Sequence, residues 1–332
     1  MNTASAPTVS VIVPVFNAER YIHASLASVL EQTYDRDAIE VIVVDDGSTD
    51  NTRGVVQALG AGITYIEQAN QGPSAARNTG IRSARGRFIG FLDADDAWLP
   101  EKIALQLAAF EAHPDVGLVF ADEDEFDEQG VQCQSLLATS RFYPEIASGA
   151  PIAKAYLKLL HENFIPTSTV LARRECFERA GLFECELKAS EDRDMWSRIA
   201  AHYAIAAVPR VLGRKRVVAS SVSRDVEKTL RSRIVMWSRA RRLFPALAPR
   251  GTVNALLAPT YLQLGFVLFD KGNVREARGM ALKSVRLAKT PRGWLGGASL
   301  VFLSCVGKPF ANVMFGISRW LRAARRSGAA SA

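Results

Sequence analysis

The sequence lacks the cysteine patterns that mark disulfide scaffolds and structural zinc sites. Its four cysteines, Cys133, Cys176, Cys185 and Cys305, contain no Cys-x-x-Cys pair, and their spacing fits no zinc-ligand set. We therefore expect free thiols in a reducing compartment. Residues 1–8 also lack the basic segment and apolar run of a signal peptide, which predicts a cytoplasmic protein.

Acidic residues are almost missing from the C-terminal part of the chain. Residues 210–332 hold four Asp and Glu against 24 Lys and Arg, a net charge of +20, whereas residues 1–209 carry a net charge of −13. This division predicts two parts with different partners, because an acidic part suits a divalent cation and a basic part suits an anionic surface. Lipid headgroups are favoured over nucleic acid, for which the basic part carries no recognised binding motif.

Apolar runs long enough to cross a bilayer are also lacking, since a spanning helix takes roughly 20 residues. Residues 294–306 are apolar but number only 13, and they predict a buried core helix or an interfacial segment. Residues 310–324 repeat apolar side chains at helical spacing, with arginines around Trp320. This segment either lies in a membrane interface, as a peripheral contact on the inner face of the cell membrane, or packs on neighbouring helices.

Residues 9–120 alternate short β-branched runs with helical segments. The expected strands are residues 9–15, 39–44, 63–66, 87–92 and 116–120, and the expected helices are residues 20–32, 51–59, 73–84 and 100–112. Nearly continuous apolar strands are typical of a sheet covered on both faces. The pattern predicts an α/β fold with a doubly wound, mostly parallel sheet, whose ligands bind at the carboxyl ends of the strands.

The rest of the chain is expected to complete this domain and add a helical appendage. Residues 122–130 are acidic and predict a surface loop or hairpin, in which the run 122–125 is solvated. Further predictions are helices at 152–163, 174–180 and 191–202, a strand at 168–172 and an edge strand at 211–218. Helices are then predicted at 226–247, 253–270, 274–288 and on to residue 326. The expected domains are residues 8–223 and a basic, all-helical region at 224–332.

Two of the expected strands end in carboxylates. Asp45 and Asp46 follow the second strand, and the sequence Asp93-Ala94-Asp95-Asp96 follows the fourth. Mg²⁺ and Mn²⁺ prefer oxygen ligands and usually bind one or two carboxylates together with substrate phosphates. Each motif alone has a simpler interpretation as the start of a loop, but two acidic strand ends on one rim favour a metal-diphosphate site.

Between these motifs, Gly72 and Pro73 open a helix that carries Arg77. A helix N-terminus and an arginine are both suited to a nucleotide's phosphates. The alternative is an ordinary surface arginine.

Four ordered motifs, at residues 14–17 (PVFN), 43–50 (VVDDGSTD), 72–78 (GPSAARN) and 92–96 (LDADD), resemble the family 2 glycosyltransferases over residues 8–220. The resemblance implies a GT-A fold and a nucleotide-diphosphate sugar as donor. It places Pro14, Phe16 and Asp46 along the base and ribose, with Asn17 and Asp45 in the same nucleotide-binding set. Arg77 would lie near the base or phosphates and Asp93 near the ribose and metal. Asp95 would be the principal ligand of Mg²⁺ or Mn²⁺.

The family's third acidic element resembles Glu191-Asp192. By this resemblance Glu191 belongs to the substrate site, and Asp192 is the general base that takes the proton of the acceptor hydroxyl in an inverting transfer. Asp194 is a rival base. Both residues of the pair also suit the N-terminus of the expected helix at 191–202.

The sequence lacks the Gln-x-x-Arg-Trp motif of processive synthases, which favours addition of a single sugar. The basic residues 214–216 with Ser220, Ser221 and Ser223 either close over the phosphates or form a solvated edge. We expect a UDP-sugar donor, with GDP and dTDP sugars open. The expected acceptor is a glycan or lipid-linked molecule in bacterial surface-polysaccharide assembly.

Two rival functions are disfavoured. A nucleotidyltransferase usually has a glycine-rich loop after its first strand, where this chain has PVFN. A binding scaffold would not need Asp93, Asp95 and Asp192.

Overall fold

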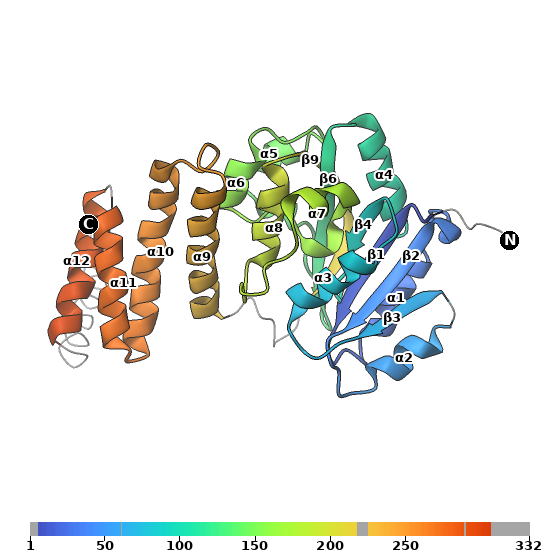
Figure 1. The fold of residues 1–332 in the computed structure, drawn as a ribbon, viewed down its shortest axis with the longest axis horizontal. Helices are drawn as coiled ribbons and strands as arrows, with labels where there is room; N and C mark the ends of the chain where they lie inside the picture. Colours follow the sequence, from blue (N-terminus) through green and yellow to red (C-terminus); the bar gives the residue numbers. More distant parts are fainter. Residues whose placement is uncertain (1–5, 61, 218–224, 289, 307–332) are drawn as a thin grey trace, which may run out of the picture. The chain divides into compact units, whose positions relative to one another are not determined.

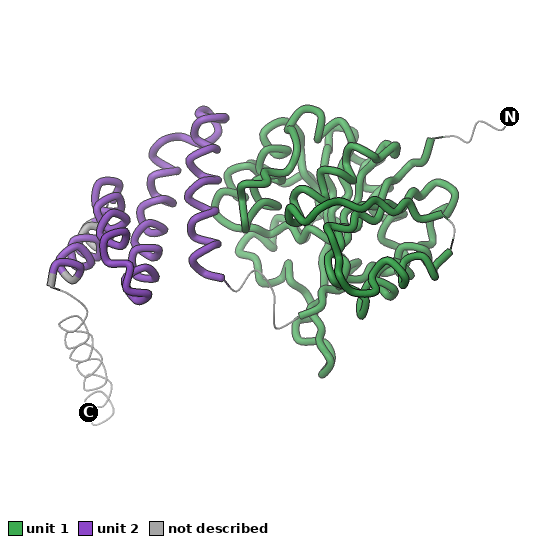
Figure 2. The backbone as a smooth tube through the Cα atoms, turned by 60° about the horizontal axis from the view of Figure 1, so that its bottom comes forward, with its two compact units in different colours: residues 1–221 green, residues 222–332 purple. Residues whose placement is uncertain are grey.

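The computed structural model describes residues 6–60, 62–217, 225–288 and 290–306. The chain divides into two compact units, residues 1–221 and 222–332 (Figure 2).

The first unit is built on one nine-stranded mixed sheet (Figure 1). Its strands lie in the order β3-β2-β1-β4-β8-β6-β9-β5, with β7 paired to β6. Six strands run in one direction, and β5, β7 and β8 run against them. The strands are β1 (Val9–Val15), β2 (Ile39–Asp45), β3 (Ile63–Glu67), β4 (Phe88–Phe91), β5 (Ala97–Trp98), β6 (Val116–Asp127), β7 (Gly130–Cys133), β8 (Leu171–Arg173) and β9 (Ala204–Arg216).

Helices cover both faces of this sheet, as its apolar strands predict. Every residue of β1 is buried, and successive side chains enter two different cores. Helices α1 (Ile22–Leu30), α2 (Thr52–Ala58) and α4 (Lys102–Ala112) supply one core. Helices α3 (Pro73–Ser83), α6 (Ala155–His161), α7 (Arg174–Ala180) and α8 (Glu191–Ala200) supply the other, to which the short α5 (Tyr143–Ile146) adds Ile146.

The prediction that residues 122–125 form a solvated loop is wrong for its first two residues. Strand β6 continues through this run into the hairpin with β7, and Asp122 and Glu123 are only 5% and 2% exposed. Burial raises the pKa of the Glu123 carboxyl well above its usual value. The predicted edge strand near residue 211 is also different, because β9 lies inside the sheet between β6 and β5.

Helix α3, which carries Arg77, approaches the sheet through Gly80. A Cβ atom at this position would lie 2.4 Å from Cγ2 of Ile12, which is fully buried in β1. We expect Gly80→Ala to destabilise the first unit by about 1–3 kcal/mol because the core would be overpacked. As a control, Gly279→Ala, where a Cβ meets nothing within 4 Å, should stabilise its helix by about 0.5–1 kcal/mol. Calorimetric unfolding of each variant measures both effects, and a neutral Gly80→Ala would refute the close contact.

The second unit consists of helices in its described part. These are α9 (Val226–Leu243), α10 (Arg250–Asp270), α11 (Val274–Leu287) and α12 (Pro291–Val306). Its core contains Leu230, Leu264, Ala277, Ala281 and Leu300. The amphipathic segment predicted at residues 310–324 lies outside the described residues.

Helix α10 departs from the expectation that the chain lacks an apolar helix of spanning length. Its 21 residues are long and apolar enough to cross a membrane by length and composition. Polar residues such as Asn254 and Gln263 interrupt the run, which is why the sequence did not reveal it. Of the most apolar 18-residue stretch of α10, 44% is buried inside the structure. The core helix of a helical bundle in water can have the same length and composition, so these two properties do not make α10 a membrane span.

Candidate active site

Hydrogen bonds join the loops that follow β1 and β2 at the carboxyl edge of the sheet. Asn17 has a φ of +49°, in the left-handed region that asparagine tolerates. Its backbone N–H donates to Oγ of Ser48 at 2.9 Å, and its Oδ1 accepts from the backbone N–H of Thr49 at 2.7 Å. Beside it, the Phe16 side chain remains 50% exposed, whereas Pro14 is buried inside β1. Of these three predicted nucleotide-site residues, Phe16 and Asn17 are exposed and Pro14 is not.

Asp45 and Asp46, at the end of β2, are buried and accept hydrogen bonds from the segments that follow β2 and β3. Asp45 accepts from the backbone N–H of Ser48 at 2.7 Å and from the Tyr65 hydroxyl. Asp46 accepts three N–H donors from the following segment: the Gln68 side chain at 2.7 Å and the backbones of Gln71 and Gly72 at 3.0 and 2.7 Å. Because Gly72 caps α3, Asp46 ties the end of β2 to the helix that carries Arg77.

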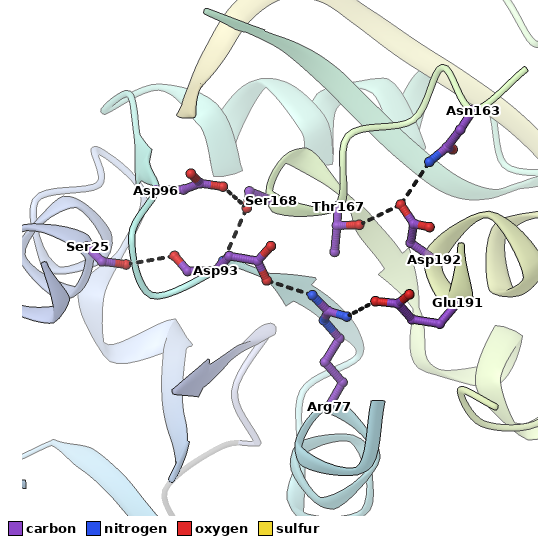
Figure 3. A network of polar contacts seen from close by, with 9 residues as sticks. All are labelled: Ser25, Arg77, Asp93, Asp96, Asn163, Thr167, Ser168, Glu191 and Asp192. Carbon is purple, nitrogen blue, oxygen red and sulfur yellow. Dashed lines mark hydrogen bonds and ion pairs between the residues drawn. The ribbon is translucent and has the colours of Figure 1, made fainter. Parts of the chain in front are cut away.

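Arg77 joins two of the acidic motifs directly (Figure 3). Its side chain is 6% exposed and lies 2.7 Å from Asp93 Oδ1 and 3.2 Å from Glu191 Oε1. Burial lowers the pKa of the guanidinium, but the charges of Asp93 and Glu191 outweigh it and raise the pKa overall. The arginine therefore holds the turn after β4 against the beginning of α8, residues that lie 98 positions apart in the sequence.

The turn after β4 contains three carboxylates, Asp93, Asp95 and Asp96, whose surroundings differ. Asp96 is 6% exposed and accepts from Oγ of Ser168 at 2.5 Å and from the backbone N–H of Arg216 at 3.0 Å. Burial, with the charges of Asp93 and Asp95, raises the pKa of Asp96 to about 8. Asp95 is partly buried, and its carboxylate accepts no hydrogen bond from another residue within the described chain. Burial followed by the charge of Asp93 raises the pKa of Asp95.

Glu191 and Asp192 occupy the first turn of α8, next to Ser190 with a φ of +59°. Asp192 Oδ2 accepts from the Asn163 side chain at 2.8 Å and from the Thr167 hydroxyl at 3.4 Å (Figure 3). Burial raises the pKa of Glu191, and the neighbouring charge of Asp192 adds to this effect. The carboxylate of Asp192 thus lies beside Glu191, on the side of Arg77 opposite Asp93.

Asp194, the rival base, lies in a buried ion pair. It is 4% exposed and pairs with Arg198 at 2.8 Å. That arginine also donates to the backbone oxygens of Ala180 and Leu182, which fixes the segment before α8.

The residues near Asp95 fit a divalent cation held jointly with a substrate. Among the described residues, no group of three or more histidine, cysteine, aspartate and glutamate side chains could hold a metal without other ligands. Asp95 nevertheless offers a carboxylate that accepts no hydrogen bond from any other described residue, with Asp93 close enough to raise its pKa. Mg²⁺ and Mn²⁺ commonly take one or two carboxylates and complete their shell with water and phosphate oxygens.

Sequence reasoning missed the residues that support these motifs. Ser168 accepts from the backbone N–H of Asp93 and donates to Asp96. Asn163 and Thr167 hold Asp192, and the Arg216 Nε donates to the backbone oxygen of Asp95 at 3.3 Å. Only Arg216 carried a signal, as part of the basic residues 214–216. Its companions Ser220, Ser221 and Ser223 lie outside the described residues.

The family model for "Glycosyl transferase family 2" matches residues 10–178. Among curated proteins, an uncharacterised glycosyltransferase of Rickettsia typhi is 30% identical over 71% of this chain and 72% of its own length. The chain covers only 33% of a second uncharacterised glycosyltransferase, from Rickettsia felis, with 29% identity.

Solved structures share the fold. The TarS 1–349 structure from S. aureus in complex with UDP has a TM-score of 0.61 at 21% identity, covering 89% of this chain and 88% of that one. The mannosyltransferase PcManGT from Pyrobaculum calidifontis, in complex with GDP-Man and Mn²⁺, has a TM-score of 0.59 at 24% identity and covers 97% and 87%.

Proposed function

Because this chain belongs to glycosyl transferase family 2 and has a GT-A-like fold, we propose that it is an inverting enzyme that transfers one sugar from a nucleotide-diphosphate donor to an acceptor hydroxyl. The observation that carries the proposal is the bridge from Asp93 through Arg77 to Glu191. It brings the turn assigned to the donor within reach of Asp192, the carboxylate assigned to the acceptor.

In the proposed reaction the acceptor hydroxyl gives its proton to Asp192. The hydroxyl oxygen bonds to the anomeric carbon as the bond from that carbon to the diphosphate oxygen breaks. The electron pair leaves with the nucleoside diphosphate, so a single displacement inverts the anomeric configuration. Asn163 and Thr167 orient the carboxylate that receives the proton.

The donor is proposed to lie over the carboxyl ends of β1, β2 and β4. Phe16 offers an exposed ring against which a base can stack. Asp46 acts mainly by holding the segment 68–72, with one acceptor position left for a base N–H. Asn17 and Asp45 shape the same edge of the site.

Asp95, with Asp93, is proposed to hold Mg²⁺ or Mn²⁺ together with the donor's phosphates. The bound cation would offset the negative charge of the departing diphosphate. The neighbours' ligands, UDP in one and GDP-Man with Mn²⁺ in the other, make these donor classes the first to test.

The proposed setting is assembly of a surface polysaccharide or related glycan at the inner face of the cell membrane. The acceptor is then a glycan or a lipid-linked molecule, and the basic helical unit supplies contact with an anionic membrane surface.

Thermal shift tests the donor and metal assignment. We expect UDP or GDP with Mn²⁺ to raise the unfolding temperature of the first unit, because a ligand stabilises the state that it binds. Asp95→Ala should lose the Mn²⁺-dependent part of this shift. Glu111→Gln, an exposed carboxylate on α4, should keep it. An unchanged shift in Asp95→Ala would remove Asp95 from the metal site.

A further inference from the structure

Charge is unevenly distributed within the second unit, and it follows the helix topology. From residue 222 on, the sequence contains four acidic residues: Asp225, Glu227, Asp270 and Glu276. They lie at the beginning of α9, the end of α10 and the beginning of α11. Arg231 brings two of these helices together by pairing with Glu227 at 2.9 Å and with Glu276 at 2.8 Å. We call this part of the bundle the acidic end because it holds all four of these carboxylates, beside lysines and arginines with which some of them pair.

The opposite end of the same bundle is basic. There α9 ends, α10 begins and α11 ends, as the antiparallel course of these helices in Figure 1 shows. The Ser284 hydroxyl donates to the backbone oxygen of Ala258 at 2.7 Å, which fixes the last part of α11 beside the first part of α10. We define the basic end by its exposed residues Arg241, Arg242, Leu243, Leu247, Arg250 and Arg286.

These four arginines carry uncompensated charge. Within the described part of the chain, none of them forms an ion pair. Arg241, Arg242 and Arg286 lie in last turns, where a cation complements the helix dipole. Arg250 is the first residue of α10, whose first turn contains no acidic residue, so there the dipole disfavours it. Helix stability therefore does not explain the whole group.

Apolar side chains lie among these cations. Leu243 is the last residue of α9, and the connection to α10 reads Phe244-Pro245-Ala246-Leu247-Ala248-Pro249. Buried Ala248 anchors it by donating its N–H to the backbone oxygen of Phe244 at 2.8 Å. Leu243 and Leu247 stay 46% and 39% exposed. The end of α9 and this ordered connection thus present two leucines between Arg242 and Arg250.

We propose that the basic end docks on an anionic lipid bilayer. Its arginines would bind lipid phosphates, while Leu243 and Leu247 enter the boundary between headgroups and acyl chains. The charges are complementary, and the exposed leucines favour a bilayer over nucleic acid, whose surface offers phosphates without an adjoining apolar layer. This inference rests on the proposed function, for which it names the residues that contact the membrane. It can be tested by vesicle binding, without measuring sugar transfer.

Co-sedimentation of the full chain with phosphatidylcholine vesicles, with and without phosphatidylglycerol, tests the proposal. Wild-type protein should bind only the anionic vesicles. The triple variant R241Q/R242Q/R250Q should weaken this binding by about 100-fold, since each arginine near such a surface contributes roughly fivefold. Leu243→Ser with Leu247→Ser should weaken binding without reducing its dependence on salt.

The matched control is K228Q/K271Q/R275Q, which removes three positive charges around the acidic end. It should bind nearly as wild type does. Equal losses of vesicle binding in the two triple variants would show that binding depends only on net charge, and would overturn the proposal. So would full binding by R241Q/R242Q/R250Q, which would move the contact elsewhere in the chain, or no binding by wild type. Because vesicle binding is read without donor or acceptor, none of these results bears on the proposed transfer.

Discussion

Asp192→Asn is expected to lower kcat by about 10²–10⁴-fold, the usual contribution of a positioned general base. The amide has nearly the same shape, so it keeps the hydrogen bond from Asn163, but it cannot take the proton of the acceptor. Donor affinity should stay unchanged, because the proposed donor contacts come from other elements. Nucleoside-diphosphate release in the presence of acceptor measures the first effect, and thermal shift with the donor measures the second.

Two controls separate this effect from a folding defect. Glu186→Gln changes a carboxylate in the segment before α8 that forms no ion pair with any described residue, and it should be neutral. Asp194→Asn should instead lower stability, because Asp194 is the buried partner of Arg198. Full activity in Asp192→Asn, or loss of activity only in Asp194→Asn, would reverse the assignment of the base.

Arg77→Met is expected to destabilise the first unit by about 3 kcal/mol. Removing one partner of a buried ion pair commonly costs about 3–5 kcal/mol, because the remaining charge is left without compensation. We take the lower end because the Asp93 side chain is 37% exposed and can regain water, while Glu191 is 17% exposed. Urea unfolding followed by circular dichroism measures the change.

The control for this effect is Arg53→Met. Arg53 pairs with Glu67 at 2.7 Å, but both side chains are more than half exposed, so the loss should be within about 1 kcal/mol. Equally small losses of unfolding free energy in both variants would contradict the role of Arg77 as the buried bridge between Asp93 and Glu191. Arg77→Met should also weaken donor-dependent stabilisation, since Asp93 would no longer be held.

The regular part of the fold could be predicted from the sequence because each strand and helix carries its own pattern. Strand β1 is buried on both faces and is a nearly continuous apolar run, and Pro73 begins α3 where a first turn tolerates proline. The helical second unit followed from the same periodicity. The order of the strands could not be predicted, because the antiparallel β8 enters between β4 and β6 through contacts that are distant in sequence.

The candidate site likewise contains residues that sequence motifs predicted and residues that only the fold reveals. Motifs along the chain identified Asp93, Arg77, Glu191 and Asp192, and the structure brings these four together. The resemblance gave Asp96 no role, and only the fold shows that its oxygens accept from Ser168 and from the backbone of Arg216. Asn163 and Thr167 lie in segments without a recognisable motif, and only the position of α8 gives them a role.

The most direct test of a single displacement driven by Asp192 is the anomeric configuration of the first product. Proton NMR of a turning-over reaction with an α-linked UDP-sugar reports this configuration through the coupling between H1 and H2 of the transferred sugar, where that sugar has an axial H2. The account predicts a β-linked product that forms as UDP is released. An α-linked product would contradict it, because retention requires a different course of substitution at the anomeric carbon.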